Sequence, residues 1–201
     1  MLARAVIIIA AAVTKLAAQN PADTGLATLL ADDQTRDTGV RVVVASGTDK
    51  IPLLLSWART PPPKLDDFQQ YILRISLAQI FGQLKIAEAI PFLIKNISLL
   101  DWPLVMPNVW MKTPQVIEQR MPAVSALIRI GPEALDALMD KTWGAEAAGD
   151  RLAAIFVVAR IAAATKDPQM SEKAREFLLT SLREANLQRH WAQEGLSLLE
   201  K

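Results

Sequence analysis

The sequence predicts an all-α protein. Apolar residues make up 51% of the 201 residues, but only 5% are aromatic and only 8 are glycine, a composition that favours helices over a turn-rich β-sandwich. Apolar side chains recur at steps of three and four residues, which is the spacing of one helix face. No long stretch alternates with period two. The valine-rich run at residues 40–45 lies between helical patterns and is therefore also predicted to be helical.

The first 18 residues predict a secretory signal peptide. Arg4 precedes an unbroken apolar run at residues 5–13, and small residues end the segment at Ala18, an order that is typical of exported chains. This run is too short to cross a bilayer, which needs about 20 residues, so no integral membrane span is expected in the mature chain. We expect a single mature domain of residues 19–201 in the periplasm or outside the cell. The alternative is a buried N-terminal helix.

Helix-breaking residues divide the rest of the chain into four pairs of helices. The segments that separate the two helices of each pair are residues 46–49, 82–83, 131–132 and 166–168. In the last segment, Asp167 and Pro168 have the pattern of an N-cap followed by proline at the first helical position. Thr113 and Pro114 give the same start signal for the third pair.

The apolar positions of these helices predict the core. In the first pair, one face of the second helix is expected to hold Ile51, Leu54, Leu55 and Ala58. In the second pair, one face of the first helix is expected to hold Phe68, Tyr71, Ile72 and Ile75. Four leucines occupy corresponding positions in successive second helices and are expected to be buried equivalents: Leu54, Leu93, Leu138 and Leu178.

The junctions within the pairs resemble one another. Gly47 precedes Ile51-Pro52, Gly82 precedes Ile90-Pro91, and Gly131 precedes Leu135. The step from Ile51 to Ile90 is 39 residues, from Ile90 to Leu135 it is 45, and from Leu138 to Leu178 it is 40. Two helices in a period of about 40–47 residues are typical of HEAT or armadillo units, and the chain resembles the HEAT-repeat family over about residues 24–184.

This resemblance implies an α-solenoid of about four HEAT-like helical hairpins, in which the second helices line one face. Each hairpin would bury its apolar side only against its neighbours, so the ends of the array need covering. Residues 185–200 have one apolar side and are expected to form a C-terminal capping helix. The alternative is an irregular helical bundle.

A longer connection at residues 99–112 interrupts the repeat. It holds Trp102, Met106, Trp110 and Met111 around two prolines, which prevent a continuous helix. Such an apolar loop either covers the adjoining hairpin or is exposed as a binding surface, and both interpretations stay open. Tryptophan and methionine are frequent at the centres of interfaces. These four residues, together with Trp57 on a second helix, are therefore the candidate partner-binding residues.

No catalytic, cofactor or metal site is predicted. The chain has no cysteine and one histidine, His190, so thiolate metal sites and cysteine nucleophiles are excluded. It has no glycine-rich phosphate loop and no nucleophile elbow. Acidic pairs such as Asp66-Asp67 precede expected helices, where carboxylates favour the helix dipole. The formal net charge is +1 with dispersed arginines, which argues against a nucleic-acid partner.

We therefore expect a non-enzymatic scaffold that binds a protein or peptide without a cofactor. Its contact positions on the second helices are mixed in sign: Lys50, Trp57, Lys85, Glu88, Lys95, Asn96, Asp136, Asp140, Lys141, Glu176 and Arg183. Two alternatives are a lyase-type or other enzyme, which would need a pocket with convergent polar groups, and a purely structural subunit of a larger assembly.

Overall fold

A computed structural model describes residues 21–101, 114–140, 148–184, 193, 195–197 and 199. All regular structure in these residues is helical, so the all-α prediction is confirmed, and residues 40–45 are helical as expected. The helices are α2 (Pro21–Leu30), α3 (Arg36–Ala45), α4 (Ile51–Arg59), α5 (Asp67–Gln83), the 3₁₀ helix η1 (Ala87–Ala89), α6 (Ile90–Lys95), α7 (Pro114–Arg120), α8 (Pro122–Ile130), the 3₁₀ helix η2 (Pro132–Ala134), α9 (Leu135–Met139), α10 (Ala148–Ala164) and α11 (Pro168–Glu184).

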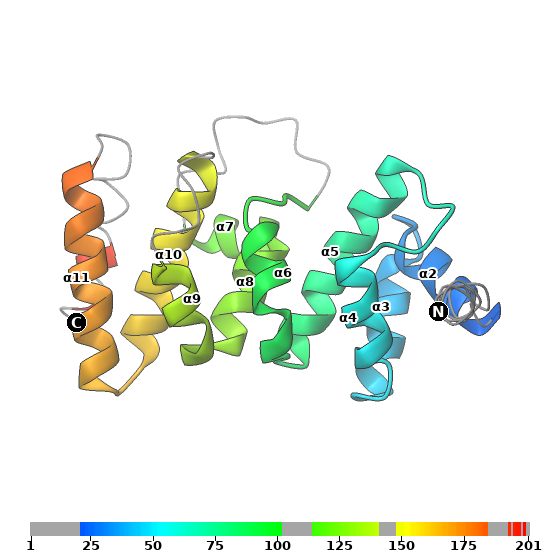
Figure 1. Cartoon of the computed structure of the whole chain (residues 1–201), viewed down its shortest axis with the longest axis horizontal. Coiled ribbons are helices and arrows are strands. Elements are labelled where there is room, and N and C mark those ends of the chain that lie inside the picture. The colour runs from blue at the N-terminus through cyan, green and yellow to red at the C-terminus, as the bar shows by residue number, and fades with distance from the viewer. Residues whose placement is uncertain are drawn as a thin grey trace, which may run out of the picture.

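Most helices pack against helices that are near them in the chain. Helix α3 packs on α5, α5 on α8, α8 on α10, and α10 on α11. The shorter α6 and α9 contact each other, and α9 also contacts α11. Figure 1 shows the result as an elongated molecule, with α2 towards one end and α11 at the other.

Local chemistry explains where α5 and α11 begin. The Asp66 carboxylate accepts the Gln69 N–H at 2.8 Å, and the Gln69 side chain accepts the Asp66 N–H at 3.1 Å. This reciprocal capping box satisfies two N–H groups that have no partner within the helix. Before α11, the Asp167 carboxylate accepts the Gln169 N–H at 2.9 Å, and Pro168 is the first helical residue. The predicted cap at Asp167 is therefore confirmed.

The break predicted at residues 82–83 is wrong. Helix α5 continues through Gly82 to Gln83, and the chain turns at Leu84 and Lys85, where Lys85 has a φ of 53°. Gly82 is buried within the helix, and a Cβ atom there would lie 2.6 Å from Cα of Ala126 in α8. The glycine therefore permits the close approach of two helices and does not make the turn.

The four equivalent leucines are buried as predicted. Leu54, Leu93, Leu138 and Leu178 each have 0% exposure. The prediction for Phe68 is wrong, because its side chain is 56% exposed while Ile72 and Ile75 on the same helix are fully buried. Phe68 lies in the first turn of α5, where Asp66 and Asp67 are exposed as well. The face continues along the helix, but neighbouring helices do not cover its beginning.

The described part of the C-terminal segment packs against the last two helices. Residues 193, 195–197 and 199 are helical. Gly195 is buried, and a Cβ atom there would lie 2.8 Å from Cβ of Ala159 in α10. Leu196 and Leu199 pack against the core as partly buried residues. These contacts lie within the stretch at residues 185–200 for which a capping helix is expected.

Candidate protein-binding groove

The structure describes one of the five candidate partner-binding residues. Trp102, Met106, Trp110 and Met111 lie outside the described residues. Trp57 lies in α4 and is 4% exposed, so the prediction that it occupies a non-core position is wrong. The reason is the orientation of α4, whose buried face consists of Ile51, Leu54 and Trp57 at three-residue steps. The sequence contains this spacing, but the expected face with Leu55 and Ala58 fits the apolar residues almost equally well.

Trp57 nevertheless lines a groove between α4, α5 and the segment from η1 to α6. The groove has a volume of about 630 Å³, which lies in the range of ligand-binding clefts. Figure 1 views the molecule from the side on which α4, α6 and α9 lie in front. We call this feature the α4–α6 groove. It brings together Trp57, Glu88, Lys95 and Asn96, four of the contact positions expected on the second helices.

The floor of the α4–α6 groove is apolar. Leu73 and Leu77 of α5 line it from below with 1% exposure each. Phe92 of α6 is half-buried there, and its ring meets the buried ring of Phe81 edge to face, with centroids 5.8 Å apart at 83°. This arrangement is favourable for aromatic pairs, and it holds Phe92 in place at the groove.

The rim of the groove is basic. Arg59 at the end of α4 and Lys95 at the end of α6 are exposed, and Arg74 of α5 is half-buried. None of the three forms an ion pair within the described residues, although Arg74 Nε donates to the Gln70 carbonyl at 3.3 Å. Among the described residues that line the groove, Glu88 is the only acidic one. The described lining residues, three cations and one carboxylate, therefore carry a surplus of positive charge.

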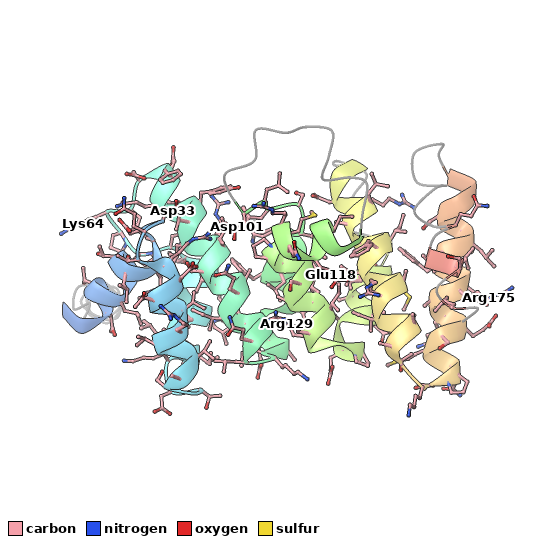
Figure 2. The ribbon with its side chains drawn as sticks, turned by 180° about the vertical axis from the view of Figure 1, so that it is seen from behind. Asp33, Lys64, Asp101, Glu118, Arg129 and Arg175 are labelled. Carbon is pink, nitrogen blue, oxygen red and sulfur yellow. The ribbon has the colours of Figure 1, made fainter. Side chains whose placement is uncertain are left out.

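A second hollow, of about 650 Å³, lies between α3, α5, α7 and α8. Figure 2 shows Glu118 and Arg129 on this opposite side of the molecule. Two acidic residues and two arginines line this hollow: Asp37, Glu118, Arg41 and Arg129. Glu118 already pairs with Arg160 at 2.6 Å, and Arg41 Nη2 donates to the Thr38 hydroxyl at 3.2 Å. The charges of its described lining residues are therefore balanced and partly paired with their own neighbours, unlike those of the α4–α6 groove.

A buried arginine fixes the chain next to the connection at residues 99–112. Arg36 Nη2 in α3 lies 2.7 Å from Asp101 Oδ1, and Arg36 Nε lies 3.3 Å from Asp33 Oδ1. The Tyr71 hydroxyl of α5 donates to the Leu100 carbonyl. Burial, assisted by the Asp101 carboxylate, raises the pKa of Tyr71 above its ordinary value. These contacts tie the start of the connection to two helices and have a structural role.

The described residues contain no group of histidine, cysteine, aspartate and glutamate side chains that could hold a metal ion. None of the helices in this part of the chain is long and apolar enough to span a membrane. No family model, curated protein or solved structure matches the chain. A function must therefore be argued from the α4–α6 groove itself.

Proposed function

We propose that the chain is a non-enzymatic protein- or peptide-binding module built as a HEAT-like α-solenoid. The observation that carries this proposal is the α4–α6 groove, because it combines an apolar floor with cations that have no ion-pair partner in the described residues. Interfaces gain affinity from apolar anchors that fill pockets, surrounded by a polar rim. The groove offers both features on one side of the molecule.

Two observations support the solenoid part of the proposal. Successive helices α3, α5, α8 and α10 each pack on the next, as expected when every hairpin buries its apolar side against its neighbours. The four leucines that recur near a 40-residue period are all fully buried. The groove then lies where two successive hairpins meet, since α4 belongs to the first pair and α6 to the second.

Export of the module is part of the proposal and rests on the first 18 residues alone. A basic residue, a short apolar run and small residues in this order direct secretion. The intact mass of the protein from its native host should correspond to a chain that begins at or near Gln19. A dominant cytosolic species that retains Met1 would contradict export and would leave the binding function unaffected.

Site-specific photo-crosslinking tests the binding function. A photoreactive amino acid is placed at Lys95, which is exposed on the groove, and in a matched variant at Phe68, which is 56% exposed and does not line the groove. In the native host we expect discrete protein adducts from position 95 that are absent from position 68. Identical adducts at both positions, or none at position 95, would contradict binding at the groove.

A further inference from the structure

We propose that the α4–α6 groove binds an acidic peptide segment in which aspartate or glutamate residues flank a large apolar side chain. This inference rests on the proposed function and adds the chemical class of the partner. It is carried by two properties of the groove that are independent of each other, the surplus of positive charge at its rim and the half-buried apolar groups at its floor.

The charge surplus comes from three separate elements. Arg59 lies in the last turn of α4, Lys95 in the last turn of α6, and Arg74 in the middle of α5. Cations at helix C-termini are favoured by the helix dipole. This preference explains the presence of Arg59 at the end of α4 and, separately, of Lys95 at the end of α6. It does not account for Arg74, nor for the convergence of all three on one groove.

These cations are available to a ligand. Arg59 and Lys95 are exposed, and the described residues contain no carboxylate within ion-pair distance of any of the three. Arg74 uses Nε for a hydrogen bond to the Gln70 carbonyl, so its other guanidinium nitrogens remain for a carboxylate. Arginine binds carboxylates with paired hydrogen bonds, and a groove of positive potential speeds the approach of an acidic partner and disfavours a basic one.

The apolar floor favours a peptide that carries a large apolar side chain between its acidic residues. Leu55, Ala58 and Phe92 line the groove and are half-buried, and Pro61 and Pro91 are exposed at it. A purely electrostatic ligand would leave these surfaces in water. An aromatic or aliphatic side chain that covers them would add the burial that makes a residue dominant at an interface.

The opposite hollow provides an internal comparison. It has nearly the same volume, about 650 Å³, but its two acids and two arginines cancel, and Glu118 is already paired with Arg160. Substitutions there can change the net charge of the whole protein as much as substitutions in the groove do. Any effect of long-range charge alone would therefore be the same for both sites.

Fluorescence anisotropy with three synthetic peptides tests the proposal on the full mature chain. The first labelled peptide has glutamates flanking a tryptophan, the second has lysines in place of the glutamates, and the third has serine in place of the tryptophan. We expect the first peptide to bind roughly tenfold more tightly than the second, because ion pairs with the exposed Arg59 and Lys95 and the half-buried Arg74 should each contribute a few-fold. The serine peptide should also bind more weakly, and salt should weaken the first peptide most.

Two charge-reversed variants locate the effect. The double variant Arg59→Glu with Lys95→Glu should lose the preference for the glutamate peptide, because both reversed residues line the groove. The control Arg41→Glu with Arg129→Glu changes the net charge equally at exposed positions of the opposite hollow and should keep the preference. Circular dichroism and thermal melting establish that both variants are folded.

The peptide and crosslinking results can separately contradict the acidic preference, the location of the site and the proposed function. Equal or tighter binding of the lysine peptide, lost in the groove variant, would overturn the acidic preference and leave groove binding intact. Loss of the preference in the control variant alone would place the site elsewhere. If none of the peptides binds and the crosslinker at position 95 gives no adduct, both this inference and the proposed function are wrong.

Discussion

Leu93 and Glu88 lie close together in the chain but differ in burial, so they should differ in their contribution to stability. Leu93 lies in the short α6 with 0% exposure, whereas Glu88 in the adjoining η1 is exposed. Leu93→Ala should lower the free energy of unfolding by about 2–5 kcal/mol, because apolar contacts are lost and a cavity remains. Glu88→Ala should change it by less than about 0.5 kcal/mol. Chemical denaturation measures both, and equal effects would show that the buried face of this segment is misassigned.

Tyr71 reports directly on its surroundings because it is the only tyrosine in the chain. Burial and the nearby Asp101 carboxylate raise its pKa above the ordinary value of 10.0, against smaller opposing contributions from the positive charges of Arg74 and Arg36. Its ionisation, followed by ultraviolet absorbance, should have a higher midpoint in the folded chain than in the chain unfolded by guanidinium. Removing the negative charge with Asp101→Asn should lower the folded midpoint.

The sign of the linked pH effect on stability follows from the raised pKa. The neutral phenol is favoured in the folded state, so this contribution to stability is fully present below pH 10.0 and is lost as the pH rises through the folded pKa. Tyr71→Phe should remove this part of the alkaline destabilisation. Identical midpoints in the folded and unfolded chain would contradict the burial of this hydroxyl.

Residue periodicity in the sequence identified the core leucines but not the orientation of every helix. On α4 the expected face contained Leu55 and Ala58, yet these are half-buried, while Trp57 is buried with Ile51 and Leu54. In so short a helix, two faces that differ by one residue fit the pattern of apolar residues almost equally well. The choice between them depends on packing against α5 and η1, which lies outside the local sequence.

At the scale of elements, the capping residues and two of the three glycine junctions were predicted correctly: Gly47 and Gly131 lie between helices with φ of 76° and 89°. Asp66, Asp167 and Pro168 mark real helix starts because their effect is local: a carboxylate accepts N–H groups and a proline fixes φ. Pro122 begins α8 where one kinked helix was expected to continue, and the preceding Met121 is extended with a φ of −114° and a ψ of 91°, as residues before proline tend to be. Gly82 has a long-range role, so its neighbours in sequence do not reveal it.

The contact between α5 and α8 depends on that glycine. A Cβ atom at Gly82 would lie 2.6 Å from Cα and 2.7 Å from Cβ of Ala126, and a backbone neighbour cannot move aside like a flexible side chain. Gly82→Ala should therefore lower the free energy of unfolding by about 1–3 kcal/mol through overpacking. This loss should exceed the better helix propensity of alanine, worth up to about 1 kcal/mol.

Gly25 offers the matched control for this prediction. It lies within α2, is exposed, and nothing lies within 4 Å of the position its Cβ would occupy. Gly25→Ala should leave stability unchanged or raise it by up to about 1 kcal/mol. The two substitutions are chemically identical, so opposite signs in urea denaturation would locate the cost in the contact of α5 with α8. Stabilisation by both would mean that the two helices lie further apart.

At the scale of the whole molecule, the α4–α6 groove illustrates what the sequence could and could not predict. The expected contact positions included Trp57, Glu88, Lys95 and Asn96, all of which line the groove. The concave shape depends on how α4, α5 and the segment from η1 to α6 are placed, and Arg74 reaches the groove from α5, which is not one of the helices expected to supply contacts. A repeat pattern identifies units that stack, whereas the shape of their junction is set by contacts between residues distant in sequence.

If the helices form an array of stacked hairpins, as proposed, a destabilising substitution should act mainly on its own end of the molecule. Helix α11 packs on α10 and α9, whereas α2 packs on α3 and α5 at the other end of the molecule (Figure 1). When each unit contacts mainly its neighbours, stability is approximately a sum of local contributions, and an end unit can open without the rest. Substitutions at the two ends should then act on different helices.

Leu178 and Leu30 make this expectation testable, since each is fully buried, the first in α11 and the second in α2. Each substitution to alanine should cost about 2–5 kcal/mol locally. In native-state hydrogen exchange, Leu178→Ala should raise amide exchange in α10 and α11 and leave α3 protected. Leu30→Ala should raise amide exchange in α3 and leave α10 and α11 protected. If both variants instead raised exchange equally along the whole chain, the molecule would open as one unit, as an irregular helical bundle does, and the repeat interpretation would be wrong.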